Sequence, residues 1–320
     1  MQLPSTLREL ADEALRGSGG QTLTRAHERL SARYRAEVHD GRAHVDDEMT
    51  ALAYVATRMP ATYAAVSAAF RAVANVRGDF MPRTLLDAGA GPGTVLWAAA
   101  QAWPSLAEAL LIERSAAIAR LGGRFSAKAG IARVTWSNDD MVAGLRGTEP
   151  RDLVTLAYVL GEIEDRLRDD LIQRLWSLTG DTHVVVESGT PAGWTRILRS
   201  RDLLIAAGAH IIAPCPHALA CPLAPPDWCH FAQRVARSKL HRETKQAESP
   251  FEDEKFIYLA ASRIAGRKPA GRVIARPQAA SGRVNVKLCV ADGQARWRLF
   301  TRREGDHYRK ARRLEWGDAI

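Results

Sequence analysis

Cysteine is scarce in this 320-residue chain, which contains four. The scarcity excludes a disulfide-rich secreted scaffold, in which cysteines are dense. Three of the four, Cys215, Cys221 and Cys229, fall within residues 213–234, and Cys289 follows 60 positions later. This placement favours one four-thiolate metal site over two unrelated disulfides. The prolines of the same stretch remove backbone donors, so we expect an irregular, rigid loop there.

Long apolar runs are also missing. No continuous apolar stretch reaches about 18 residues, so the sequence predicts no membrane-spanning helix. Residues 1–20 contain acids beside arginines and no apolar run, which is unlike a secretory signal or a typical transit peptide. We therefore expect a cytoplasmic protein in a reducing compartment, without membrane contact, and we expect it to be a monomer.

Basic charge is present in excess, but mainly at one end of the chain. Residues 231–320 hold 21 Lys or Arg and 10 Asp or Glu, a net of +11, against 24 basic and 26 acidic residues before them. A segment this positive attracts polyphosphate, most commonly nucleic acid, although a cationic surface kept for solubility is the alternative. The side chains we predict to contact RNA phosphates are Arg234, Arg237, Lys239, Arg242, Lys245, Arg302, Arg303, Arg312 and Arg313.

The first part of the chain predicts helices. Apolar residues recur at three- and four-residue intervals from residue 3 to 78, which indicates a helical N-terminal subdomain over 1–80. Tyr54, Arg58 and Tyr63 lie in this region and allow two interpretations, a ligand-facing wall or ordinary helix packing. Aromatic residues at helical spacing usually belong to the core, and we adopt that interpretation.

From residue 84 onwards, short apolar runs alternate with amphipathic helices, which is typical of a parallel sheet with crossover helices. We assign residues 81–265 to this α/β domain, with the cysteine loop inserted between its last two strands. Residues 266–320 form a basic β extension with a helical tail, and Cys289 lies on the polar face of its middle strand. The expected strands of the main sheet are 84–89, 109–113, 132–137, 152–158, 182–187, 210–214 and 256–263.

A glycine loop follows the first of these strands and reads Asp87-Ala88-Gly89-Ala90-Gly91-Pro92-Gly93. Glycines allow the backbone to approach a ligand closely, and the helix that follows favours an anionic group at its start. The spacing is G-x-G-x-G, the pattern of S-adenosylmethionine-dependent methyltransferases, and not the G-x-G-x-x-G of dinucleotide-binding folds. We expect Asp87 to anchor the methionine amino group and the amides of Gly89, Gly91 and Gly93 to surround its carboxylate.

Acidic residues after the next strands extend this pattern. Glu113 ends the second strand and is placed to bind the ribose hydroxyls, and Asp139 or Asp140 follows the third strand and would approach the adenine. A turn that merely joins strand to helix is the alternative. Methyltransferases present groups to the methyl acceptor after the fourth strand, and we call this the acceptor side. There, Tyr158 and Glu162 in YVLGE are candidates to position a substrate, although capping and packing explain them equally well.

Taken together, several motifs resemble the ribosomal small-subunit methyltransferase-like family from about residue 50 to the end of the chain. These are LLDAGAGPGT, YVLGE, VVVESGTPAGW, APCPH, CPL, WCHF, RVARS, DEKFIYLA and ARRLEWGD. The resemblance implies a Rossmann-like class I methyltransferase sheet and an S-adenosylmethionine site. It also implies binding to the assembling small ribosomal subunit near its rRNA, with small-subunit ribosomal proteins as further partners. Finally, it implies a four-iron four-sulfur cluster whose ligands correspond to Cys215, Cys221, Cys229 and Cys289.

From the residues alone, several alternatives remain open. Four thiolates suit zinc as well as iron and sulfur, and the wide cysteine spacing is typical of neither zinc ribbons nor ferredoxins. With four thiolates present, we interpret His217 and His230 as loop packing or RNA contacts. Three functions compete: an rRNA methyltransferase, a non-catalytic small-subunit assembly factor that keeps the fold, and a small-molecule methyltransferase with a structural zinc.

Overall fold

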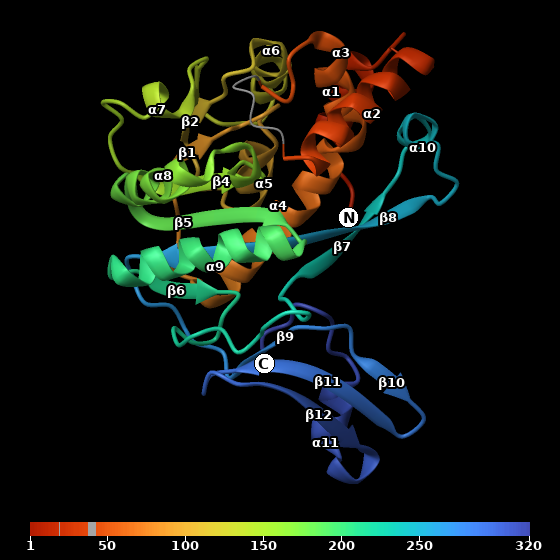
Figure 1. Cartoon of the computed structure of the whole chain (residues 1–320), viewed down its shortest axis with the longest axis vertical. Helices are drawn as coiled ribbons and strands as arrows, with labels where there is room; N and C mark the ends of the chain where they lie inside the picture. Colours follow the sequence, from red (N-terminus) through yellow and green to blue (C-terminus); the bar gives the residue numbers. More distant parts are fainter. Residues whose placement is uncertain (19, 38–42) are drawn as a thin grey trace.

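The computed structural model describes residues 1–18, 20–37 and 43–320. A large α/β unit forms the upper part of the molecule in Figure 1, and a small sheet built from the C-terminal residues lies below it. The segment that carries Cys215, Cys221 and Cys229 lies between the two parts. It therefore has elements of both parts as neighbours.

In the described residues the main sheet has eight strands, and its central order is β3-β2-β1-β4-β5-β8-β6. The first five pair in parallel, whereas β8 runs antiparallel to β5 and β6. This arrangement confirms the predicted Rossmann-like methyltransferase sheet. The strands are β1 (Thr84–Ala88), β2 (Glu108–Ile112), β3 (Arg133–Ser137), β4 (Arg151–Ala157), β5 (Thr179–Ser188), β6 (His210–Ala213), β7 (Phe231–Ala236) and β8 (Phe251–Ser262).

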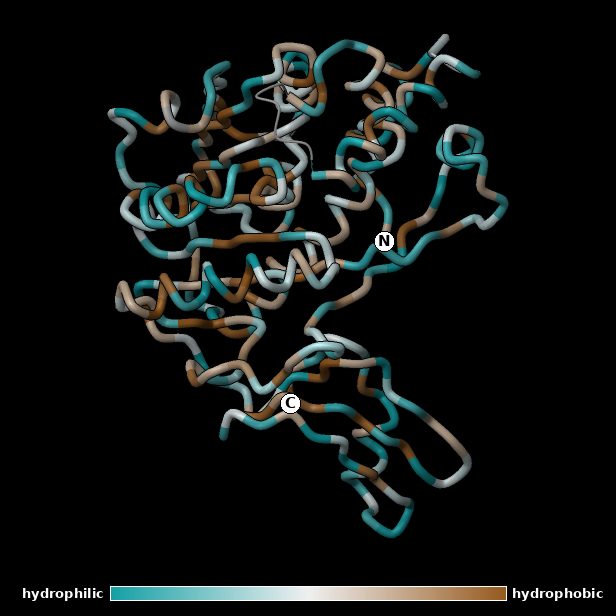
Figure 2. The backbone as a smooth tube through the Cα atoms, viewed as in Figure 1, coloured by the Kyte–Doolittle hydropathy of each residue, from teal (hydrophilic) through white to brown (hydrophobic). Residues whose placement is uncertain are grey.

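Helices cover both faces of the sheet, which explains why its central strands are nearly continuous apolar runs. Val184, Val185 and Val186 of β5 are all buried, and Figure 2 shows hydrophobic residues gathered along the sheet. In the described part of the chain, no helix has the length and apolarity needed to cross a membrane. The crossover helices are α5 (Thr94–Ala102), α6 (Ala116–Ser126), α7 (Met141–Gly144), α8 (Asp165–Ser177) and α9 (Pro191–Ala206), with a short 3-10 turn η1 (Leu160–Glu162) after β4.

The predicted N-terminal helices are present. Asp47 begins α3 with a capping box, in which its carboxylate accepts the Thr50 amide at 2.7 Å. A break at Arg58 separates α3 from α4, and Pro60 stands at the start of α4, where its missing N–H costs nothing. Because α4 packs on the main sheet, the boundary at residue 80 stays a prediction. The helices are α1 (Ser5–Ala14), α2 (Gln21–Arg35), α3 (Glu48–Thr57) and α4 (Met59–Val76).

One strand of the main sheet was not predicted. The cysteine segment was expected to run to residue 234, but residues 231–234 belong to β7, which pairs with the first half of β8. This pair projects from the sheet and carries α10 (Lys239–Lys245) near its tip (Figure 1). We call residues 231–255 the arm. The strand was missed because only Phe231 and Val235 are buried in it, too weak an apolar alternation to stand out.

The C-terminal sheet contains the three predicted strands and a short fourth one, β10. Val284, Val286 and Leu288 are buried in its own small core, beneath a helix of the C-terminal tail. Cys289 lies on the opposite face, as the alternation predicts, but it is buried because the cysteine loop covers that end. The elements are β9 (Gly271–Val273), β10 (Gln278–Ala280), β11 (Arg283–Val290), β12 (Ala295–Thr301), η2 (Arg302–Glu304) and α11 (Asp306–Ala311).

A buried guanidinium joins three distant elements at the edge of the main sheet. Arg77, just after α4, donates to both carboxylate oxygens of Asp181 on β5 at 3.1 Å and to the Ser262 hydroxyl on β8 at 2.7 Å. Its side chain is 3% exposed and that of Asp181 is 20% exposed. Removing the cation therefore leaves a carboxylate in an environment that solvent only partly reaches.

We predict that Arg77→Met lowers the free energy of unfolding by about 3 kcal/mol. Removing only the cation leaves the Asp181 carboxylate partly buried without its partner, which costs more than removing both charges. Urea denaturation followed by circular dichroism measures this. Arg71→Met is the matched control, since Arg71 lies exposed on the same helix and should change the value by less than about 0.5 kcal/mol. Equal stability of both variants would contradict the assignment of Arg77 as a structural tie.

Candidate cofactor cavity and cysteine site

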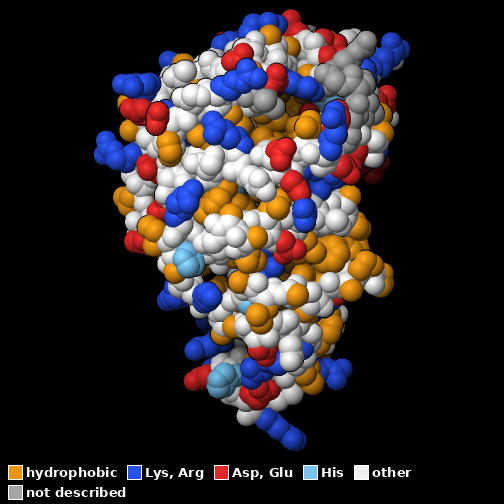
Figure 3. Space-filling view, turned by 60° about the vertical axis from the view of Figure 1, so that its left-hand side comes forward, with side chains coloured by type: hydrophobic (Ala, Val, Ile, Leu, Met, Phe, Trp, Pro, Cys, Tyr) orange, Lys and Arg blue, Asp and Glu red, His pale blue; other side chains and the backbone are white. Residues whose placement is uncertain are grey.

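A cavity of about 460 Å³ opens at the carboxyl ends of β1, β2 and β4. The strand order reverses between β1 and β4, and open α/β sheets bind ligands at such a point. Glycine-loop residues form one wall, and residues of the N-terminal helices, Tyr34 and Tyr54 among them, form another. Figure 3 shows a hollow in the upper half of the molecule with hydrophobic side chains at its floor and acidic ones beside it.

The glycine loop is shaped by backbone conformations that other residues rarely adopt. Gly89, Gly91 and Gly93 all have positive φ, and a Cβ on Gly89 would lie 2.5 Å from the Val159 side chain. Gly89 and Gly91 line the cavity. Gly93 instead begins α5 and packs near Trp136, outside the cavity wall.

Glu113 is the acid most closely tied to the loop. One of its carboxylate oxygens accepts the Gly91 amide at 2.9 Å, and the other accepts the Ser115 amide at 2.8 Å. Burial raises the pKa of Glu113, against these hydrogen bonds, which favour the ionised form. The carboxylate lines the cavity where the sequence placed a ribose contact.

The other predicted cofactor contacts divide into two groups. Asp140 lines the cavity, whereas Asp139 is engaged with the Ser137 hydroxyl and does not line it. Asp87 lies on β1 just before the loop and is fully buried, and one of its carboxylate oxygens accepts the Thr155 hydroxyl at 2.6 Å. Its other oxygen has no hydrogen-bond partner, and burial raises its pKa to about 7. Asp87 therefore contacts β4 through Thr155 and does not line the cavity itself.

Acidic side chains outnumber basic ones around the cavity. Among the described residues, five carboxyl groups and three guanidiniums line it, together with one histidine. A site with this balance favours a cationic ligand over a polyanionic one. The charged lining residues are Glu37, Glu113, Asp140, Glu162, Glu187, Arg58, Arg114, Arg196 and His44.

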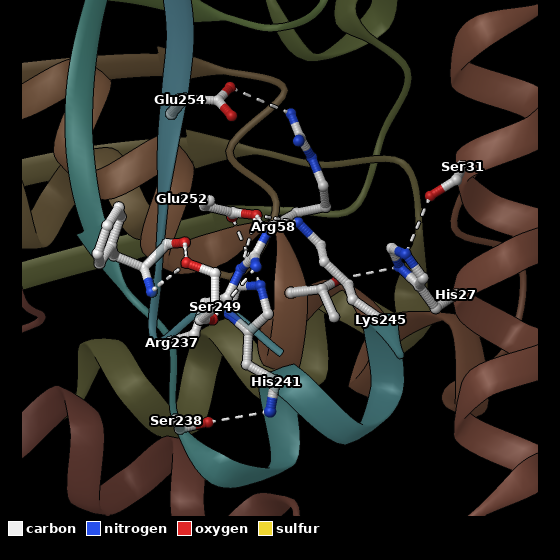
Figure 4. Close-up of polar contacts among 12 residues, drawn as sticks. His27, Ser31, Arg58, Arg237, Ser238, His241, Lys245, Ser249, Glu252 and Glu254 are labelled. Carbon is white, nitrogen blue, oxygen red and sulfur yellow. Dashed lines mark hydrogen bonds and ion pairs between the residues drawn. The ribbon is translucent and has the colours of Figure 1, made fainter. Parts of the chain in front are cut away.

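The acceptor side corrects one expectation. Tyr54 and Arg58 line the cavity, so the core interpretation was wrong for them, whereas Tyr63 is buried as core. Tyr158 adopts φ 60°, a strained value for a residue with a side chain, and donates from its hydroxyl to Glu254 at 2.9 Å. Arg58 lies 3.5 Å from the same carboxylate oxygen (Figure 4).

Glu162 lies at the end of η1 on the same side of the cavity. Burial raises its pKa to about 8, and the nearby carboxylate of Glu113 raises it further. The imidazole of His44 lies 3.8 Å from its carboxylate. At neutral pH, Glu162 is therefore largely protonated and available as a hydrogen-bond donor.

All four cysteines line a second, smaller cavity between α9, the irregular loop after β6 and the C-terminal sheet. They are free thiols. Burial raises the pKa of each of Cys215, Cys229 and Cys289, the last to about 12, and the other thiols raise them further. Within the described residues, no three His, Cys, Asp or Glu side chains are arranged so that they hold a single metal ion.

The two histidines of the loop have different surroundings. His217 is buried, and its Nε2 lies 3.4 Å from the Cys289 sulfur. His230 stacks on Trp228 and meets the edge of Trp316 near the C-terminus. Both therefore pack within the protein, one of the two roles predicted for them.

Two buried arginines complete the lining of the cysteine cavity, and sequence reasoning missed them. Arg201 comes from α9 and Arg272 from β9. No local pattern distinguishes them from the many exposed arginines of the chain. Their burial depends on contacts between segments far apart in the sequence.

The cations of the arm are only partly available to an external partner. Arg237 and Lys245 bind Glu252 of β8 at 2.8 and 2.7 Å, and His241 lies 3.5 Å from it (Figure 4). Burial alone would raise the pKa of Glu252, but the nearby His241 and the hydrogen bond from Lys245 hold that pKa well below its usual range. These cations fix the arm internally, and Arg242 is half-buried as well.

The remaining predicted phosphate contacts are on the surface. Arg234 is exposed but paired with Asp253, and Lys239 lies 3.8 Å from Glu243. Figure 3 shows basic side chains continuing to the lower tip of the molecule, which the C-terminal part forms. The C-terminal arginines that were predicted are all exposed, namely Arg302, Arg303, Arg312 and Arg313.

The strand order, the glycine loop and the acid at the end of β2 define the class: a methyltransferase-like α/β protein. The chain belongs to the family described as mitochondrial small ribosomal subunit Rsm22, whose model matches residues 48–320. This confirms the resemblance found in the sequence.

Two relatives illustrate the family. The human mitochondrial ribosome assembly protein METTL17 is 33% identical over 299 residues, covering 85% of this chain and 63% of the relative. The Rsm22-cox11 tandem protein 2 of Schizosaccharomyces pombe is 24% identical over 321 residues, covering 83% of this chain and 42% of the relative. The chain thus spans less than two thirds of the length of these relatives.

Solved structures with a similar fold are methyltransferases. The magnesium protoporphyrin IX methyltransferase of Synechocystis with bound S-adenosylmethionine is 15% identical, covers 77% of this chain and 98% of its own, and has a TM-score of 0.42. An O-methyltransferase family protein from Burkholderia thailandensis is 14% identical, covers 73% and 64%, and has a TM-score of 0.43. At these low sequence identities and TM-scores, the two structures add nothing to the topology described above.

The raised pKa of Glu162 predicts a pH dependence of stability. The folded protein holds this proton up to about pH 8, whereas the unfolded chain releases it near the ordinary value of 4.5. The free energy of unfolding should therefore fall as pH rises between these values, by about 2–4 kcal/mol from this group. Glu162→Gln should remove the part of this fall in the free energy of unfolding that comes from Glu162. Urea denaturation at several pH values between these limits measures it.

Glu164→Gln is the control, because Glu164 lies exposed two residues away and should leave the wild-type slope unchanged. A Glu162→Gln variant with the full wild-type slope would show that this carboxyl does not carry the effect.

Proposed function

We propose that this protein binds S-adenosylmethionine and acts on the small ribosomal subunit during its assembly, in a reducing cytoplasm. The observation that carries the cofactor part is the cavity at the strand-order reversal. There Glu113 binds the glycine-loop amide and carboxylates outnumber cations. The ribosomal part is supported by family membership and by the ribosome assembly role of the human relative.

The charge of the cavity supports the methyl donor over a dinucleotide. S-adenosylmethionine carries a sulfonium and an ammonium group, which a carboxylate-rich lining stabilises. A dinucleotide would instead bring a pyrophosphate next to the carboxylate of Glu113. In this proposal Glu113 holds the ribose, Asp140 lies near the adenine, and the amides of Gly89 and Gly91 face the methionine carboxylate.

Glu113→Ala should weaken S-adenosylmethionine binding at least tenfold, about 1.4 kcal/mol, because it removes both the ribose contact and the bond that shapes the loop. Isothermal titration calorimetry measures the dissociation constant. Glu108→Ala is the control, since Glu108 lies at the opposite end of the same strand, away from the cavity. Wild-type protein that does not bind the ligand, or equal affinity of both variants, would refute this site.

A second candidate function is supported by the acceptor side. The Tyr158 hydroxyl is bound by Glu254 with Arg58 beside it, and Arg196 binds Glu187 and Glu37. Side chains committed to such internal contacts favour a non-catalytic assembly factor that keeps the cofactor site. Transfer of a labelled methyl group to purified small subunits would favour the enzyme, and its absence from protein that binds the cofactor would favour the assembly factor.

The cysteine site supports a metal–thiolate centre. An iron–sulfur cluster presents a separate iron to each thiolate, so its ligands need to surround one cavity and need not converge on a single atom. Cys215, Cys221, Cys229 and Cys289 do surround one cavity, which fits this donor set. Such a centre would supply a bond between the loop and the C-terminal sheet. Zinc is the alternative and would require the thiolates to converge.

The exposed C-terminal arginines support an electrostatic contact with rRNA. They lie on the part of the chain with the largest basic excess, and they are free of the internal pairing that engages Arg237 and Lys245. Phosphate contacts of this kind release counterions, so affinity depends steeply on salt. Ribosomal proteins next to that rRNA would be further partners.

Replacing Arg302, Arg303, Arg312 and Arg313 by Gln should reduce the slope of log affinity against log salt by about 0.7–0.9 for each phosphate that these side chains neutralise. Filter binding to small-subunit rRNA over a salt series measures the slope. The control replaces four exposed arginines of the N-terminal region, Arg8, Arg16, Arg25 and Arg71. Equal slopes for both quadruple variants would argue against a C-terminal RNA surface.

A further inference from the structure

Two guanidinium groups are buried in the wall of the cysteine cavity. Arg201 is 2% exposed and Arg272 is 3% exposed, and both line the cavity together with all four cysteines. Arg201 extends from α9, and Arg272 extends from β9, where it is paired in register with Cys289. They thus approach the cavity from both parts of the molecule.

The partners of these guanidiniums are mostly neutral. Arg201 donates to the carbonyls of His217 and Leu219 at 3.1 and 2.6 Å, and Arg272 donates to those of Pro214 and Gly317 at 2.9 and 2.8 Å. Three of these four carbonyls belong to the cysteine loop. These bonds tie the loop, but the carbonyls carry no net negative charge to balance the two guanidiniums.

Carboxylate compensation is weak. Arg201 forms an ion pair with Asp202 at 3.4 Å, and that carboxylate is 68% exposed. Among the residues that the structure describes, the buried Nε of Arg201 and one buried terminal nitrogen of Arg272 have no hydrogen-bond partner. A buried cation without a nearby anion is strongly unfavourable, so two of them beside one cavity point to a source of negative charge there.

We propose that Arg201 and Arg272 are the charge partners of an anionic metal–thiolate centre held by the four cysteines. This proposal rests on the centre inferred above. Four thiolates around a core of charge +2 leave a net charge of −2, which two guanidiniums balance. The sum is the same for an iron–sulfur core of that charge and for zinc, so the pairing follows from the thiolates and not from the metal.

Two consequences follow for a bound centre. The guanidiniums stabilise the metal-bound form over the empty one, because without the anion their charges stay buried and unpaired. They also stabilise the reduced form of a redox-active centre over its oxidised form, because reduction adds a negative charge. Retention of the metal and the reduction potential therefore both depend on these residues.

A purely structural role gives a different result. If the arginines only tie the loop carbonyls, any side chain with N–H donors should replace them in part, so Gln and Lys should behave alike and the reduction potential should not change. If their charge matters, Lys should preserve much of the effect, whereas the neutral Gln and Met should not. Arg201→Gln and Arg272→Gln therefore separate charge from loop anchoring.

The experiment uses the full chain purified without oxygen, with iron, zinc and sulfide determined first. Loss of the bound metal to a chelator should be at least tenfold faster in Arg201→Met and Arg272→Met than in wild type. Arg199→Met is the matched control, since Arg199 lies exposed on the same helix and pairs with Asp169. Its rate should equal that of wild type.

If the metal is iron, the Met variants should also shift the one-electron reduction equilibrium at least tenfold toward the oxidised form, a fall of 59 mV. The Lys variants should stay closer to wild type. Circular dichroism of each metal-loaded variant checks that it is folded.

Met variants that lose metal no faster than Arg199→Met would overturn the role of the arginines while leaving the centre in place. The same holds if Lys and Gln variants behave alike. Wild-type protein that holds neither iron nor zinc would overturn the centre and the charge pairing together.

Discussion

The pairing of β8 with three other strands is the constraint on which both candidate sites depend. Its second half pairs with β5 and β6 inside the main sheet, and its first half pairs with β7 outside it. Because side chains alternate along a strand, its pairing register places Glu252 and Glu254 on one side of the arm. Glu254 then meets Tyr158 at the cofactor cavity, and Tyr258 reaches the cysteine cavity.

The two cavities have opposite electrostatic character, and this difference is informative. Carboxyl groups outnumber guanidiniums in the described lining of the cofactor cavity, although burial raises the pKa of one of them, Glu162, to about 8. Guanidiniums and thiols line the cysteine cavity, where Arg201 and Arg272 have few charged neighbours. A cationic small molecule suits the first, and an anionic metal–thiolate centre suits the second. The same rule, that buried charge requires its opposite, supports both assignments.

Much of the main sheet was predictable because its signals are local. The valine run of β5 and the glycine loop after β1 each indicate an element within about ten residues of sequence. β7 was missed, and Tyr54 and Arg58 were wrongly assigned to the core, because a helical pattern does not reveal which face meets a cavity. Arg201 had no local signal at all.

The sequence by itself determined most of the strand and helix order, the set of four cysteines and the basic excess of the C-terminal part. Each of these follows from composition or short-range periodicity. Only the tertiary structure decided which charges are engaged: Arg237 and Lys245 bind Glu252, and Arg201 and Arg272 lie buried beside thiols from distant segments. The reason is physical. Whether a charge is exposed, paired or buried depends on the neighbours that folding brings to it, and those neighbours are far away along the chain.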